Sequence, residues 1–196
     1  MKGSGRSHPL LLHLLRLNPL LPVIDEAKLN DPPQRENFIE RVFAFNRWQS
    51  LNKTNITQDK LNAFHHAHHF CILSHGQDAW KTLQDLLTRT SDRSVQELIE
   101  EYQLQFMQPL QHPATNTGHI AVLEEILTRT KPHISAVDVE KLEQLIDLYR
   151  QRQINLAEVL PVFKNVIQCS TALELNDQIY LSLSAEEIEL RFSSFK

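Results

Sequence analysis

A long helix that begins at Asp31 constrains the fold of this chain more than any other sequence feature. The prolines upstream of it favour extended backbone, whereas Asp31 offers a capping side chain and the Pro-Pro that follows is tolerated in a first helical turn. Phe38, Val42 and Phe45 then recur at helical spacing, which predicts an apolar stripe on a helix from residue 32 to about residue 53. This change of character predicts a domain boundary near residue 31.

The rest of the chain has the same helical character. It is 196 residues long, enough for one domain with a substantial core, and its four glycines and many Leu, Gln and Glu residues favour helices over sheets. We therefore predict an all-α fold, a single bundle of about seven helices with an irregular C-terminal tail. The expected helices span about residues 32–53, 57–75, 77–89, 94–111, 119–131, 135–149 and 155–168, and the tail from 173 to 195 is expected to be irregular or to hold a short strand.

Helical spacing also identifies the expected core and the clearest interior break. The loop His112–Gly118, with the sequence HPATNTG, is the strongest turn signal inside the chain. Seven residues on the apolar stripes are expected inside the bundle: Phe38, Phe45, Phe64, Leu83, Leu142, Leu145 and Tyr149.

Cysteine content and hydropathy limit the classes of function. Two cysteines, Cys71 and Cys169, cannot hold an iron–sulfur cluster, which needs three or four thiolates, and they predict reduced thiols in a cytoplasmic protein. The apolar run Leu10–Leu17 is interrupted by His13 and Arg16 and no small-residue cleavage site follows, so we interpret it as a short helix and not a signal peptide. No apolar stretch is long enough to span a bilayer, and no membrane partner is expected.

The block His65–His69, with the sequence HHAHH, has spacing that suits metal binding. On a helix, His65 and His69 share one face, but such a pair chelates a transition metal only if a third ligand converges on it. The block lacks the glutamate that serves as general base in the HExxH motif. Two interpretations stay open: a metal-dependent hydrolase, or histidines that form hydrogen bonds in half-buried positions. The sequence assigns no catalytic residue, metal site or cofactor.

Several segments occur in an order typical of one family of helical domains. They are the junction Leu20–Trp48, the pairs Phe64-His65, His68-His69 and Ser74-His75, the set Tyr102, Pro113, His119 and Val122-Leu123, and the segment Leu145–Arg150. Together they resemble the YbgA family, a helical domain of unknown function found C-terminal to iron–sulfur desulfidase domains that act on thiolated uracil. The resemblance covers about residues 20 to 192 and is strongest at the junction and around the first histidines.

The resemblance implies a division of the chain and a function. Residues 1–31 would be the remnant of a preceding domain plus a linker, and residues 32–196 the YbgA-like helical domain, with the cysteine-bearing desulfidase part missing. In that family the helical domain is thought to deliver thiolated RNA to the desulfidase. The expected function is therefore a non-catalytic accessory domain that binds tRNA in connection with thiouridine desulfuration by a separate iron–sulfur desulfidase.

The charge distribution selects the candidate RNA contacts. The net charge is −4, yet the first 60 residues carry nine Lys or Arg against six Asp or Glu, while the remainder carries eleven against eighteen. Phosphate binding requires cations on the surface. The RNA-binding candidates are Arg41, Arg47 and Lys53, a second cluster of Arg129, Lys131 and Lys164, and the histidines His65, His69, His75 and His119, of which His65 and His75 would orient the nucleotide.

Departures from the family pattern fall on polar positions. Ala121 and Glu125 stand where the family has asparagine and a second histidine, Thr128–Thr130 replace its Gly-Tyr-Phe, and His69 replaces a lysine. Aromatic and amide side chains are the ones that read unpaired bases. Their loss leaves open a second function, a protein-interaction module without RNA affinity that docks on a partner desulfidase through its apolar N-terminal helix.

Overall fold

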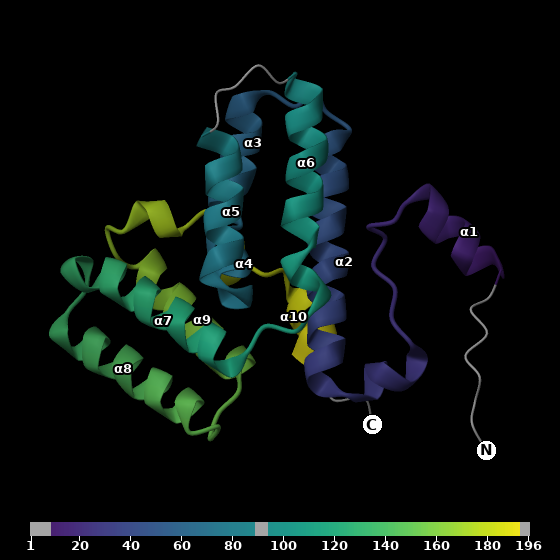
Figure 1. Cartoon of the computed structure of the whole chain (residues 1–196). Helices are drawn as coiled ribbons and strands as arrows, with labels where there is room; N and C mark the ends of the chain where they lie inside the picture. Colours follow the sequence, from purple (N-terminus) through teal and green to yellow (C-terminus); the bar gives the residue numbers. More distant parts are fainter. Residues whose placement is uncertain (1–8, 89–93, 193–196) are drawn as a thin grey trace.

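The computed structural model describes residues 9–88 and 94–192. Within these ranges the chain forms ten α-helices, five short 3-10 helices and no strand (Figure 1). The all-α prediction is therefore confirmed, while the expected number of about seven helices is too low. The α-helices are α1 (Pro9–Leu17), α2 (Pro32–Asn52), α3 (Gln58–Ala67), α4 (His69–His75), α5 (Gln77–Thr88), α6 (Val95–Met107), α7 (Asn116–Thr130), α8 (Ala136–Arg150), α9 (Leu156–Gln168) and α10 (Ala185–Phe192). The 3-10 helices are Glu26–Asn30, Pro109–Gln111, Lys131–His133, Leu173–Leu175 and Ile179–Leu181.

The additional helices arise at three places. The N-terminal apolar run is the separate helix α1, and the tail forms α10 where an irregular segment or a strand was expected. The expected helix 57–75 is divided at His68, whose φ and ψ are −98° and 8°. The His68 Nδ1 atom lies 2.8 Å from the carbonyl oxygen of Phe64, and such local side-chain bonds compete with a continuous helix.

Some expectations fall beyond the described ranges. Residues 1–8, the end of the third expected helix at residue 89, and the last residues of the expected tail, 193–195, all lie outside them. Among the described helices, none combines the length and the apolar character that a membrane crossing requires.

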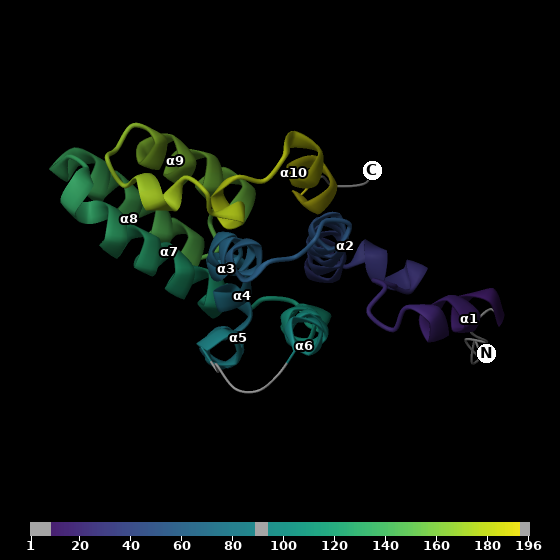
Figure 2. The same ribbon diagram turned by 90° about the horizontal axis from the view of Figure 1, so that it is seen from above.

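The helices form two groups that share α4. In Figure 1, α2, α3, α5 and α6 run upright side by side, whereas α7, α8 and α9 lie obliquely against them. Each group has its own buried apolar cluster, and α4 contributes to both, with Ile72 in the first cluster and Phe70 and Leu73 in the second. Figure 2 shows α10 returning from the second group to lie beside α2, the pair of elements with the most extensive contact.

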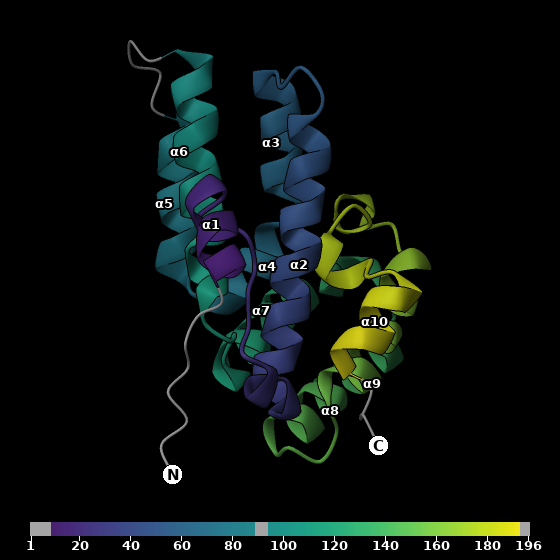
Figure 3. The ribbon, with the colours of Figure 1, turned by 90° about the vertical axis from the view of Figure 1, so that its right-hand side faces the viewer.

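The buried face of α2 is not the apolar stripe that was expected. The residues of α2 that lie in the interior are Arg35, Asn37, Glu40, Ala44 and Trp48, whereas Phe38, Val42 and Phe45 are half-buried. The prediction for this helix was wrong because α10 packs against α2 and brings charged side chains that pair with the polar residues (Figure 3). Of the seven expected core residues, Leu83 and Leu142 are fully buried and the other five are half-buried.

Helix α7 begins inside the segment expected to be a loop. The Thr115 hydroxyl accepts a hydrogen bond from the Gly118 amide at 3.0 Å and caps the helix. Gly118 then lies so close to α4 that a Cβ atom at this position would be 2.1 Å from the carbonyl oxygen of Ser74. The glycine therefore permits the close approach of α7 to the end of α4, and it does not mark a loop.

We expect the substitution Gly118→Ala to destabilise the fold by about 1–3 kcal/mol, because the new methyl group would overlap a backbone oxygen. In an ordinary helix the same change would stabilise the protein by roughly 0.5–1 kcal/mol. The sign of the change in unfolding free energy therefore shows whether α7 approaches α4 this closely. Urea unfolding measures the effect, with Ala121→Gly at an exposed position of the same helix as the matched control. A Gly118→Ala variant more stable than the parent would contradict the close approach.

Candidate functional site

A pocket of about 590 Å³ opens where the N-terminal ends of α2, α7 and α9 meet. This volume lies within the range of small-ligand sites. Among the described residues that line the pocket, Arg152 is the only Lys or Arg, so these walls are polar but not basic. The lining residues are Pro33, Glu36, Asn37, Glu40, Pro113, Ala114, Asn116, His119, Tyr149, Arg152, Gln153, Ile154, Asn155 and Glu158.

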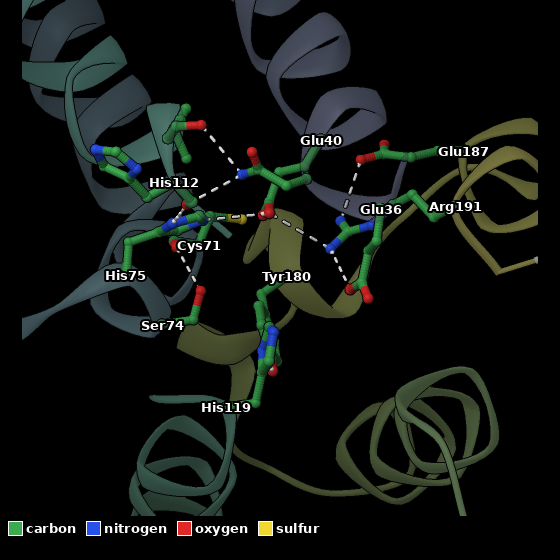
Figure 4. Close-up of polar contacts among 12 residues, drawn as sticks. Glu36, Glu40, Cys71, Ser74, His75, His112, His119, Tyr180, Glu187 and Arg191 are labelled. Atoms are coloured by element: carbon green, nitrogen blue, oxygen red, sulfur yellow. Dashed lines mark hydrogen bonds and ion pairs between the residues drawn. The ribbon is translucent and has the colours of Figure 1, made fainter. Parts of the chain in front are cut away.

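A buried ionic network lies behind the pocket, between α2 and α10 (Figure 4). Its centre is Arg191, which is 3% exposed. One guanidinium nitrogen, Nη2, lies 3.2 Å from Glu36 Oε1 and 3.6 Å from Glu40 Oε2, and Nη1 lies 3.6 Å from Glu187 Oε1. Arg47 pairs with the same Glu187. Each buried charge therefore has an opposite charge beside it, which burial requires.

His75 connects this network to the segment before α7. Its Nε2 atom lies 3.2 Å from Glu40 Oε2, and its Nδ1 atom lies 2.9 Å from the carbonyl oxygen of His112. Both partners are hydrogen-bond acceptors, and they lie on opposite sides of the ring. The Asn37 amide donates to the carbonyl oxygens of Leu110 and His112, each at 3.1 Å, and holds the same segment against α2.

Glu40 is an ionised carboxylate with one oxygen unused. Burial alone would raise its pKa, but the charge of Arg191 and the hydrogen bond from His75 outweigh burial and lower the pKa to about 2. The residue is 5% exposed, and its Oε1 atom has no hydrogen-bond partner among the described residues. A buried acceptor without a partner is uncommon in native proteins, and this one has almost no surface of its own exposed to the pocket.

Two further titratable groups line the pocket. Burial raises the pKa of Glu36, although the charge of Arg191 acts in the opposite direction. Burial lowers the pKa of His119 to about 4, so its ring is neutral at pH 7. The His119 Nδ1 atom lies 2.9 Å from the Tyr180 hydroxyl, and the half-buried Tyr149 ring packs edge-on against the His119 ring at 6.5 Å between centroids.

The other candidate histidines belong to an aromatic core and not to the pocket. The His65 ring stacks on Trp80 at 3.9 Å between centroids, and its Nδ1 atom lies 3.1 Å from the Tyr102 hydroxyl. The His69 ring lies 4.2 Å from the same Trp80. The described residues bring together no group of three or more His, Cys, Asp or Glu side chains that could hold a metal ion. His65, His68 and His69 are buried, and not half-buried as the hydrogen-bonding interpretation expected.

The six candidate cations lie on α2, at the end of α7 and on α9, and half of them have acidic partners. Arg47 pairs with Glu187, Arg129 with Glu125, and Lys131 with Glu143 at 3.5 Å. Arg41 is half-buried, and burial lowers its pKa, whereas Lys53 is exposed just after α2. Lys164 borders a separate apolar groove. Of the ten candidate residues, the structure brings His75 and His119 together around Glu40, and His65 and His69 together against Trp80.

Sequence reasoning missed Glu36, Glu40 and Arg191. The two glutamates are four residues apart and so share one face of a helix, which is a visible signal for paired carboxylates. The predicted apolar stripe of Phe38, Val42 and Phe45 lies on the opposite face of the helix, so this pair was not selected. Arg191 gave no signal, because its tail was not expected to be helical.

Comparison with known proteins identifies relatives without a known activity. Residues 69–184 match a family described as "Protein of unknown function (DUF1722)". The chain is 25% identical over 154 residues to the uncharacterized protein YbgA of Escherichia coli strain K12, an alignment that covers 78% of this chain and 91% of YbgA. No solved structure matches the chain. The family match includes His75, His119 and Tyr149, while Glu40 and Arg191 lie outside it.

Proposed function

The chain belongs to the DUF1722 family of proteins of unknown function, and we propose that it is a non-catalytic accessory domain that takes an unpaired nucleotide of RNA into the pocket beside Glu40. The proposed RNA is tRNA, and the proposed context is thiouridine desulfuration by a separate iron–sulfur desulfidase. The observation that carries the proposal is the pocket itself, which is lined by the half-buried ring of Tyr149 and by the exposed side chain of Arg152. An aromatic ring can stack on an unpaired base, and a guanidinium group can contact its phosphate.

The walls of the pocket support a nucleotide as the ligand. The Tyr149 ring is half-buried and lines the pocket, and aromatic side chains are the usual stacking partners of unpaired bases. Arg152 is exposed and lines the same pocket, where its guanidinium group can contact a backbone phosphate. Because most of the lining is uncharged or acidic, the base, and not a run of phosphates, would supply the specific contacts.

We expect Tyr149→Leu to weaken the binding of tRNA, or of a short single-stranded RNA, by about tenfold to hundredfold, because it removes a stacking surface worth about 1–3 kcal/mol per base. Fluorescence anisotropy at low and at physiological salt measures the affinity. Leu148→Ala, at an exposed position of the same helix, is the matched control and should bind as the parent does. If neither unmodified nor thiolated tRNA binds at low ionic strength, the RNA proposal is wrong.

A second function is favoured by the position of α1. Figures 1 and 2 both show α1 standing away from the two helix groups, and Leu14 and Leu17 on it are 41% and 70% exposed. An exposed apolar helix of this kind suits docking into a groove of another protein. In this alternative the chain is an interaction module for a partner desulfidase, and deletion of residues 1–17 would abolish the association without changing RNA binding.

A further inference from the structure

An apolar groove of about 200 Å³ lies between α9 and α10, separate from the polar pocket. Its described lining is apolar apart from Lys164 on α9 and the hydroxyl-bearing ring of Tyr180. On α10 the groove is lined by Ile188 and Phe192, which are half-buried, so part of each side chain still faces water. This surface, the α9–α10 groove, can therefore take an apolar side chain from a partner.

Helix α1 has an apolar face that its own chain leaves uncovered. Leu15 is half-buried, whereas Leu14 and Leu17, three residues apart and so on one face, are exposed. Figures 2 and 3 both show α1 and α10 on opposite sides of α2. The 3-10 helix Glu26–Asn30 contacts α2 and fixes the linker on the side of α1. In this arrangement α1 does not reach the α9–α10 groove of its own chain.

The charges beside the two surfaces are complementary. Glu189 precedes Phe192 by three residues on α10, so it borders the groove, and it is exposed without an ion pair among the described residues. Helix α1 has no acidic residue, and its exposed Arg16 next to Leu17 also lacks an ion pair there. The last carbonyl oxygens of a helix favour a nearby cation, so Lys164 suits the C-terminal end of α1.

We propose that the α9–α10 groove receives helix α1 of a second copy of this chain. Leu14 and Leu17 would enter the groove, with Arg16 beside Glu189 and the end of α1 beside Lys164. If each copy gives its α1 to the other, the two contacts are equivalent and the assembly closes as a dimer. A short helix in a groove buries less surface than a standard interface, so we expect a dissociation constant on the order of micromolar. The inference is independent of RNA binding.

Sedimentation equilibrium of the full chain, from about 1 to about 300 µM, tests the proposal. We expect a concentration-dependent dimer, and Leu17→Glu should raise its dissociation constant by at least about tenfold, because it places a charge where an apolar side chain is buried. Val137→Glu is the matched control, since Val137 is 73% exposed on α8 and lines neither surface. Thermal melting checks that both variants are folded. A parent chain that stays monomeric, or a dimer that Leu17→Glu leaves unchanged, overturns the inference.

Cysteine cross-linking locates the contact. The variants Arg16→Cys and Glu189→Cys are made in a Cys169→Ser background, in which the remaining Cys71 is buried. Mixed and oxidised, the two variants should form a disulfide-linked dimer, because the proposed docking brings these two positions together across copies. Each variant oxidised alone should stay free of cross-links. Absence of the mixed dimer, or equal cross-linking of either variant alone, overturns the proposed docking.

Discussion

Replacing Arg191 by methionine is expected to lower the free energy of unfolding by about 3–5 kcal/mol, because the change leaves buried carboxylates without their counter-charge. Glu40 and Glu187 are 5% and 1% exposed, and both lie within 3.6 Å of the guanidinium group. Methionine keeps most of the volume and apolar length of the side chain, so the loss reports on charge and hydrogen bonding more than on packing. Urea unfolding at pH 7 measures it.

The matched control for this variant is Arg150→Met. Arg150 also pairs with two carboxylates, Glu124 and Asp147, but its side chain is 44% exposed. Exposed ion pairs contribute at most about 1 kcal/mol, so the control should lose little stability. Similar losses in the two variants would show that the network between α2 and α10 does not hold the C-terminal helix in place.

Acidification from pH 7 to pH 5 is expected to destabilise the protein by roughly 4–8 kcal/mol, about 1–2 kcal/mol for each of four buried histidines. Burial lowers the pKa of each of them to about 4, whereas an unfolded histidine titrates near pH 6.5. Between these two values the unfolded chain binds protons that the native chain does not, so stability falls as the pH falls. The four residues are His65, His68, His69 and His119.

The pH effect is measured by urea unfolding at pH 7, 6 and 5. Glu36 works in the opposite direction, because a carboxyl group with a raised pKa stabilises the folded state as the pH falls, but it is a single group. Substituting His65 by glutamine should reduce the loss of stability between pH 7 and pH 5 by the contribution of one histidine. Equal stability at pH 7 and pH 5 would mean that these rings are protonated in the folded state.

Helical periodicity predicted the class of fold and most helix starts, because capping residues act locally. Thr57, Ser94, Ser135 and Asn155 each cap the helix that was expected to follow. Periodicity failed where a tertiary contact decides the outcome. The buried face of α2 is set by Arg191, which lies 155 residues from Glu36, and no local pattern reports such a pairing.

The candidate site was less predictable than the fold, because a pocket depends on which polar groups are left without partners. His75 and His119 were selected from a resemblance and do lie beside Glu40. The sequence did not show that these two histidines and Glu40 are neighbours. His65 was selected in the same way, yet the aromatic rings around it hold it in the core. The spacing of histidines along a helix does not distinguish a ring that faces a pocket from one that stacks on Trp80.

The most direct test of the central claim is an NMR titration of the isotopically labelled chain with a short uridine-containing single-stranded RNA. If the pocket beside Glu40 receives an unpaired nucleotide, the largest changes in backbone amide shift should fall on its lining, at Asn37, Ala114, Asn116 and Asn155. Shifts confined to the surroundings of Lys53 and Lys131, with none in the pocket, would indicate a purely electrostatic surface and would contradict the claim.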